Sequence, residues 1–121
     1  GMHLDADNIA FAPAVARSRI DIVEAFTPPP TCDMSVAQAL AAWPDKIVWA
    51  NFPSSVHVED DAAIVEATRT LLRDAAPGNR FLLGVTEDIP EAHIWRSLDL
   101  IAGVLNREGR LPLGDYPNSS R

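Results

Sequence analysis

Ionisable and amide side chains stand where predicted strands end. His3 and Asp5 are two residues apart in a short extended segment, so both face the same side of it. Glu24, Asn51 and Glu87 each close a later β-rich segment, and Asp88 follows Glu87 directly. A histidine beside carboxylates can transfer protons or bind a divalent cation. If neighbouring strands bring these residues together, they predict a site for acid–base chemistry or cation binding.

A simpler interpretation competes with this one. For Glu24 and Asn51, a polar residue at a strand end can merely mark the point where the strand leaves the core. His3 and Asp5 have no capping or turn role that explains both, which favours a functional role for that pair. The other two histidines, His57 and His93, fall in loop or helix-start segments, and we expect both to be ordinary surface residues.

Strand and helix signals alternate along the chain. After the short opening strand, β-rich segments cover residues 19–26, 46–52 and 80–86, and the last is apolar enough to predict burial on both faces. Helical patterns cover 8–18, 35–43, the segment from Asp60 or Asp61 to Pro77, and 94–107. Ser35 and Gln38 form a capping-box pattern at the second helix. This order predicts an α/β fold with a parallel sheet and its chemistry at the carboxyl ends of the strands.

Helical spacing also predicts which side chains are buried. The third helix presents one apolar face to the core, made of Ile64, Thr68, Leu71, Leu72 and Ala75. The fourth helix presents another, made of Trp95, Leu98, Ile101, Ala102 and Leu105. Gly109 suits the C-cap of the fourth helix.

Length and composition restrict the interpretation further. The chain has 121 residues, enough for one domain but only about half of a complete eight-stranded β/α barrel. We expect one domain over residues 3–112 and a flexible C-terminal tail over 113–121.

A net charge of −7 argues against nucleic acid as a partner. One cysteine, no signal-peptide pattern and no membrane-spanning apolar stretch predict a cytoplasmic protein.

Three ordered segments resemble a known superfamily. They are residues 22–33 (Ile-Val-Glu-Ala-Phe-Thr-Pro-Pro-Pro-Thr-Cys-Asp), 46–53 (Lys-Ile-Val-Trp-Ala-Asn-Phe-Pro) and 81–90 (Phe-Leu-Leu-Gly-Val-Thr-Glu-Asp-Ile-Pro). Together they look like the C-terminal half of the uroporphyrinogen decarboxylase superfamily, which includes the cobamide-dependent methyltransferases. The resemblance implies a parallel sheet of about four βα units, half of a TIM-type (β/α)8 barrel.

The resemblance also implies roles for individual residues. In the methyltransferase branch, a His-x-Cys pair and a later cysteine bind zinc, which activates a thiol. Here His3-Leu4-Asp5 occupies the first position and Glu87 the second, so carboxylates replace both thiolates. The implied metal ligands are His3, Asp5 and Glu87, which suit zinc or a harder divalent ion. Glu24 and Asn51 are then the catalytic residues that position the substrate. In the decarboxylase branch, the key aspartate and arginines come from the N-terminal half.

The predicted partner is a second half-barrel. Four βα units leave two open sheet edges, which invite association. A homodimer and a pairing with a complementary N-terminal half both cover them, whereas a stable monomer favours a flavodoxin-like closure. The chain is therefore either a methyltransferase-like or lyase-like enzyme half acting on a small molecule, or a non-catalytic subunit or binding module. A third alternative is that it is the end of a longer protein.

Overall fold

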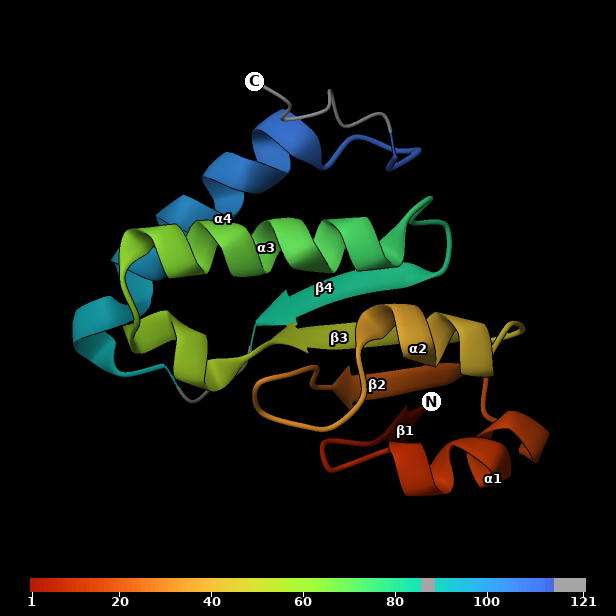
Figure 1. Ribbon diagram of the computed structural model, residues 1–121. Coiled ribbons are helices and arrows are strands. Elements are labelled where there is room, and N and C mark those ends of the chain that lie inside the picture. Colours follow the sequence, from red (N-terminus) through yellow and green to blue (C-terminus); the bar gives the residue numbers. More distant parts are fainter. Residues whose placement is uncertain (86–88, 115–121) are drawn as a thin grey trace.

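Four parallel strands form one sheet, and their order in space follows their order in the chain. The computed structural model describes residues 1–85 and 89–114. The strands are β1 (Met2–His3), β2 (Ile22–Phe26), β3 (Ile47–Phe52) and β4 (Phe81–Val85), arranged β1-β2-β3-β4 (Figure 1). Helices connect consecutive strands. This confirms the α/β prediction and matches four consecutive βα units of a TIM-type barrel.

Local sequence signals explain where the helices begin. The described helices are α1 (Ala12–Arg17), α2 (Val36–Ala42), α3 (Asp61–Ala75) and α4 (Ile94–Glu108), with short 3-10 segments η1 (Ile9–Phe11), η2 (Ser54–Val58) and η3 (Glu91–His93). Ser35 and Gln38 form the predicted capping box at α2. The Asp60 carboxylate accepts a hydrogen bond from the Ala63 N–H and caps α3. Pro13 lies in the first turn of α1, where no backbone N–H is needed.

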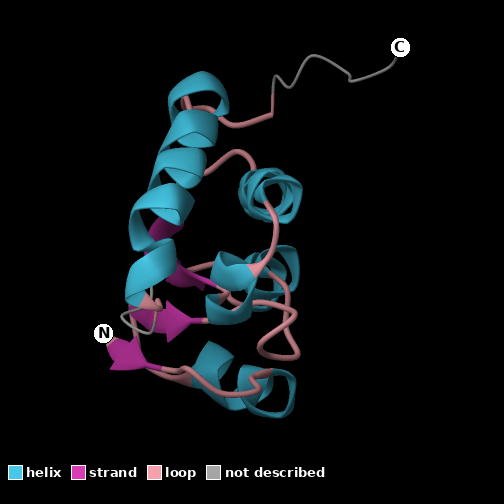
Figure 2. Cartoon of the chain, turned by 90° about the vertical axis from the view of Figure 1, so that its left-hand side faces the viewer, coloured by secondary structure: helices cyan, strands magenta, loops and turns pink. Residues whose placement is uncertain are grey.

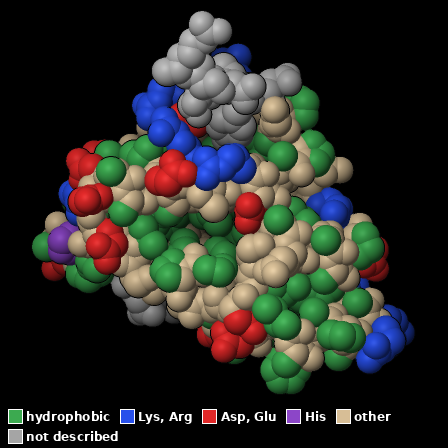
Figure 3. Space-filling model, in the orientation of Figure 1, with side chains coloured by type: hydrophobic (Ala, Val, Ile, Leu, Met, Phe, Trp, Pro, Cys, Tyr) green, Lys and Arg blue, Asp and Glu red, His purple; other side chains and the backbone are tan. Residues whose placement is uncertain are grey.

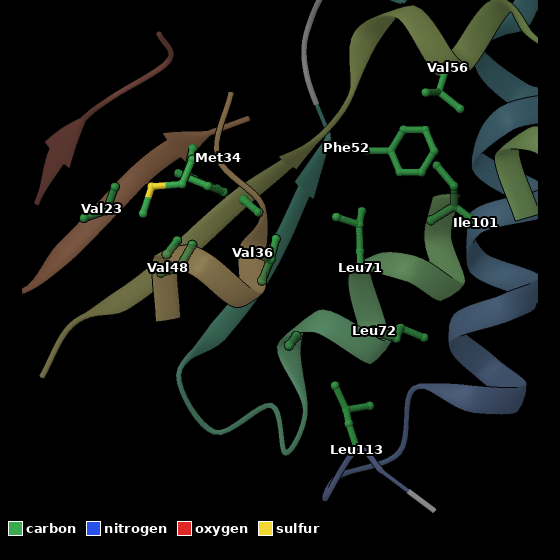
Figure 4. Packing of buried hydrophobic residues seen from close by; sticks show 14 of the residues in the cluster. Val23, Met34, Val36, Val48, Phe52, Val56, Leu71, Leu72, Ile101 and Leu113 are labelled. Atoms are coloured by element: carbon green, nitrogen blue, oxygen red, sulfur yellow. The ribbon is translucent and has the colours of Figure 1, made fainter. Parts of the chain in front are cut away.

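The hydrophobic core lies between the sheet and the helices. Val48, Ala50 and Phe52 of β3 point into it and are fully buried. Helix α3 contributes the predicted face, since Ile64, Thr68, Leu71, Leu72 and Ala75 are all buried. Figure 4 shows side chains from β2, β3, α2, α3 and α4 meeting in this core.

The other face of the sheet is open. In β3 the alternate residues Ile47 and Trp49 are 36% and 42% exposed, because α1, α2 and α3 all lie on the opposite side of the strands (Figure 2). Helix α4 packs beside α3. An apolar face without a covering layer corresponds in position to the interior of a complete barrel.

This open face corrects the prediction for β4. The strand is not buried on both faces, since Leu82, which pairs in register with Trp49 on the open face, is 47% exposed. The strand is apolar on both faces, but only one face packs against helices in the described residues. The other face is apolar and exposed. The face predicted for α4 is also partly wrong. Trp95 is 77% exposed, and the helix instead buries Ser97, Ile101 and Val104.

Two cationic side chains, one buried and one partly buried, hydrogen-bond to backbone carbonyls at the amino end of the sheet. The Lys46 amine is almost completely buried and donates hydrogen bonds to the carbonyls of Ser18 and Ile20. The Arg80 guanidinium donates to the carbonyls of Leu40, Trp43 and Lys46, and so joins the end of α2 to the start of β3. The two side chains therefore have structural roles at this end of the sheet. In β/α barrels the catalytic residues lie at the opposite, carboxyl end of the strands.

The packed chain extends beyond the predicted domain boundary at residue 112. Leu113 is 6% exposed, joins the core, and donates its backbone N–H to the carbonyl of Pro77. Residues 115–121 lie outside the described residues, so a flexible tail there stays a prediction. Among the helices that the structure describes, none has the length and apolar character to cross a membrane.

Candidate site at the carboxyl end of the sheet

His3 and Glu24 form the centre of the candidate site. The parallel register places His3 of β1 directly beside Glu24 of β2, and the Leu4 N–H continues the ladder to the Glu24 carbonyl. The His3 Nδ1 lies 2.7 Å from the Glu24 Oε2. On the other side of the ring, Nε2 lies 3.5 Å from the Asp5 Oδ2. The predicted grouping of His3 with Asp5 is therefore observed, and Glu24 joins it.

The two carboxylates change the acidity of the imidazole. The hydrogen bond with Glu24 is the main cause that raises the pKa of His3 above 6.5. Desolvation opposes it, and the charges of Glu24 and Asp5 add smaller increases. The side chain of His3 is 63% exposed, so solvent reaches the ring. A protonated imidazole of this kind can serve as a general acid near neutral pH.

An irregularity in β2 accompanies this pair. Register with β3 shifts between Val23 and Phe26, and Ala25, next to Glu24, has a φ of 56°. A non-glycine residue in the left-handed region costs about 1–2 kcal/mol, so the surrounding packing must impose it. Ala25 is 2% exposed, and its carbonyl accepts a hydrogen bond from Thr27 Oγ1. A bulge of this type re-aims neighbouring side chains, here at the end of the strand that carries Glu24.

Asn51 occupies the next strand on the same open face. It pairs in register with Gly84 of β4, and a Cβ on Gly84 would lie 3.0 Å from the Asn51 Oδ1 and 2.8 Å from the Trp49 Nε1. Glycine at this position therefore leaves room for both polar side chains above β4. The structure places Glu24 and Asn51 on adjacent strands, as predicted, while their catalytic roles stay predictions.

The predicted metal ligand Glu87 lies outside the described residues. Among the described strands, β1 and β4 lie at opposite edges of the sheet, and three strand spacings amount to roughly 14 Å. Within residues 1–85 and 89–114, no group of three His, Cys, Asp or Glu side chains is arranged to hold a metal ion. A site made of His3, Asp5 and Glu87 stays a prediction.

Two loops beside the pair are tied together. The Asp33 carboxylate accepts hydrogen bonds from the backbone N–H groups of Asn8 and Ile9, so it fixes the β1–α1 loop. The Cys32 thiol lies 3.4 Å from the Asp5 carbonyl. Burial and the nearby carboxylates of Asp7, Asp33 and Asp5 raise the pKa of this thiol. Cys32 is therefore protonated at neutral pH and a poor nucleophile.

His57 does not fit the prediction of a surface histidine. It is fully buried, with its ring 4.7 Å from that of Phe52 and its Nδ1 hydrogen-bonded to the Ser97 Oγ. The local sequence carried a signal for this, since His57 lies between Val56 and Val58 and five residues after a strand end. The partner Ser97 is 40 residues away, and only the tertiary fold identifies it.

Comparisons with protein-family models, curated proteins and solved structures found no match for this chain. The resemblance to the uroporphyrinogen decarboxylase superfamily therefore rests on the three sequence segments alone. What the fold and the side chains define is a four-stranded α/β half-barrel with a hydrogen-bonded His3–Glu24 pair at the carboxyl end of an open sheet face.

Proposed function

We propose that this chain is one half of a uroporphyrinogen decarboxylase-like or methyltransferase-like β/α barrel, and that it contributes His3, Glu24 and Asn51 to the rim of the completed active site. The observation that carries this proposal is the open sheet face. Apolar Trp49 and Leu82 are uncovered there, and the polar residues lie at its carboxyl end.

Burial energetics favour a second layer on this face. Each Å² of apolar surface removed from water contributes about 25 cal/mol, and the exposed side chains of β3 and β4 form one neighbouring set. The sheet edges also favour association, because β1 and β4 each have one side without a strand partner in the described chain. A second four-stranded half would cover the apolar face and would also pair with both edge strands, with β4 of one half beside β1 of the other.

The chemistry proposed for the rim is proton transfer by His3. Glu24 orients the ring through Nδ1 and favours its protonated form, while Nε2, on the Asp5 side, points away from that bond. In a closed barrel, the carboxyl-end rim is the place where a small-molecule substrate meets such groups. Asn51 offers an amide donor and acceptor on the adjacent strand for orienting that substrate.

The second half is either another copy of this chain or a complementary N-terminal half. Light scattering after size-exclusion chromatography tests self-pairing, with the mass of two chains as the expected result. Leu82→Glu places a charge on the open face and should return the mass to that of one chain. Ala62→Glu is the matched control, since it adds the same charge on the exposed side of α3.

A wild-type monomer at every concentration would argue against both pairings and favour a flavodoxin-like closure of the four-stranded sheet, which would contradict the barrel-completion proposal. A Leu82→Glu variant that retains the mass of two chains would contradict the open face as the contact surface. In that case the dimer uses another surface, and the barrel-completion proposal is wrong.

A second candidate function is binding of a divalent cation at the same rim. The observation in its favour is that carboxylates flank His3 at 2.7 Å and 3.5 Å. Because the described residues alone are not arranged to hold a metal, this candidate requires His3 to lose its proton and a further ligand such as the predicted Glu87. Zinc, manganese and nickel should each be tested for a rise in the melting temperature of chelator-purified protein. We expect a rise that His3→Gln abolishes and His93→Gln leaves unchanged. No shift with any of the three metals would contradict this candidate.

A further inference from the structure

A fully buried imidazole joins three elements far from His3. His57 belongs to η2, its ring lies 4.7 Å from the Phe52 ring at the end of β3, and its Nδ1 is 2.5 Å from the Ser97 Oγ of α4. Both His57 and Ser97 have no exposed surface. Figure 4 shows the same junction, where Phe52 and Val56 face Ile101 of α4. The contact therefore connects the segment after β3 to the helix after β4.

The ring has one nitrogen with no hydrogen-bond partner among the described residues. That atom is Nε2, and it is buried. Burial lowers the pKa of His57 below 6.5, because the charged imidazolium would lose its hydration without gaining an acceptor. A second proton on this ring would place an N–H⁺ in an apolar environment, which is among the costliest states for a buried polar group.

The charged groups of the surrounding elements are engaged with one another. Arg96 of α4 bonds the Asp61 carboxylate at the start of α3, donates to the Glu59 carbonyl after η2, and lies 3.4 Å from the His93 Nδ1. None of these groups contributes to the pKa shift of His57, whose cause is burial alone. Glu87 and Asp88, which follow β4 in the sequence, lie outside the described residues.

We propose that His57 and Ser97 form a pH-sensitive latch, and that protonation of the buried ring releases the start of α4 from η2. The other end of α4 has its own anchor, because the Arg69 guanidinium bonds both oxygens of Glu108. Acid should therefore loosen α4 from its first turns. Since η2 and α4 follow the carboxyl ends of β3 and β4, the release alters that side of the rim and leaves the His3 side unchanged.

Hydrogen exchange of the unmodified 121-residue chain between pH 7.5 and pH 5 tests the latch. After correction for the intrinsic pH dependence of exchange, the protection of α4 amides near Ser97 should fall as the pH drops below 6.5. Proton linkage limits this loss to about tenfold per pH unit. The amides of α2, which contributes neither the ring nor the hydroxyl that His57 contacts, serve as the internal control and should keep their protection.

Two variants and a titration separate the latch from general acid instability. His57→Phe removes the titrating group while retaining an aromatic ring, so α4 protection should no longer depend on pH. His93→Gln should keep the wild-type response. Should His57→Phe fail to fold, NMR titration of the wild-type His57 ring decides, and an apparent pKa below 6.5 is expected. Titration at or above 6.5, or α4 protection that does not change with pH, would overturn the proposal.

Discussion

Two histidines in this chain show how opposite environments act on the same side chain. His3 lies at an exposed strand end between two carboxylates, which raise its pKa. His57 lies in a sealed junction between β3, η2 and α4, where burial lowers its pKa. One ring is accessible to solvent and favours the proton, whereas the other is enclosed and disfavours it. The exposed site around His3 is thus suited to proton transfer, whereas the buried junction around His57 is suited to stabilising the packing of η2 against α4.

The same contrast applies to the residues around each histidine. Phe52, beside His57, is fully buried, whereas Trp49, three positions earlier on β3, is 42% exposed on the open face. Neighbouring residues of one strand therefore belong to a finished core and to a surface that lacks its second layer. Substitutions in the two regions should differ widely in their effect on stability.

The largest effect is expected from truncating Phe52. Phe52→Ala removes a buried ring that packs against His57, and it should lower the free energy of unfolding by about 3–5 kcal/mol. Trp49→Ala on the open face should cost far less, although the side chain removed is larger. Urea denaturation of both variants measures the difference. Equal losses would mean that the open face is packed as tightly as the core.

A smaller loss is expected at the buried hydrogen bond. Ser97→Ala leaves the Nδ1 of His57 without its partner and should destabilise the fold by about 1–3 kcal/mol. Ser55→Ala, at an exposed position of η2, should change the stability by less than about 0.5 kcal/mol. If the two variants unfold at the same urea concentration, the Ser97 hydroxyl has no structural role.

The pH dependence of stability should have opposite signs for the two histidines. For His57 the folded-state pKa is lowered, so its contribution is complete above 6.5 and is lost as the pH falls through the lowered value. For His3 the folded-state pKa is raised, so its contribution is present below 6.5 and is lost as the pH rises through the raised value. Melting temperatures of wild type, His57→Phe and His3→Gln between pH 5 and 8 separate the two contributions.

The smallest effect is expected from neutralising Glu24. Glu24→Gln keeps the shape of the side chain but removes the charge that favours the imidazolium, so the NMR-measured pKa of His3 should move back toward 6.5. Asp5→Asn should move it less, because the Asp5 oxygen is 3.5 Å from the ring. Neither change should alter the titration of His57. A larger shift with Asp5→Asn would make Asp5 the principal partner of His3.

The sequence predicted the features that depend on local spacing. The strand and helix order, the Ser35–Gln38 capping box and the buried face of α3 are all observed, because periodicity and helix-end chemistry act within a few residues. The strand-end rule also placed His3 near Glu24. That contact needs only adjacent parallel strands and a register that aligns the two residues.

Features that depend on distant partners were predicted poorly. The apolar run of β4 looks the same whether its second face meets a layer or stands open, so Leu82 was assigned to a buried position. Trp95 fits the helical spacing of α4, yet the helix is rotated toward Ser97 and Ile101. The valines on either side of His57 hint at burial, but its partner Ser97, on the helix α4 that encloses it, is 40 residues away and is identified only by the tertiary fold. The prediction that Glu87 binds a metal falls outside the described residues.

The placement of the tryptophans gives the open face an optical signal. Trp43 is fully buried against Phe26, with its indole N–H bonded to the Ala12 carbonyl, so its emission should be constant. Trp95 is exposed on α4 and can be replaced by phenylalanine. The remaining variable fluorophore is Trp49, whose indole lies against Gly84 on the uncovered sheet. Closure of that face by any second half should shift its emission to shorter wavelength, which allows association to be followed in real time without a label.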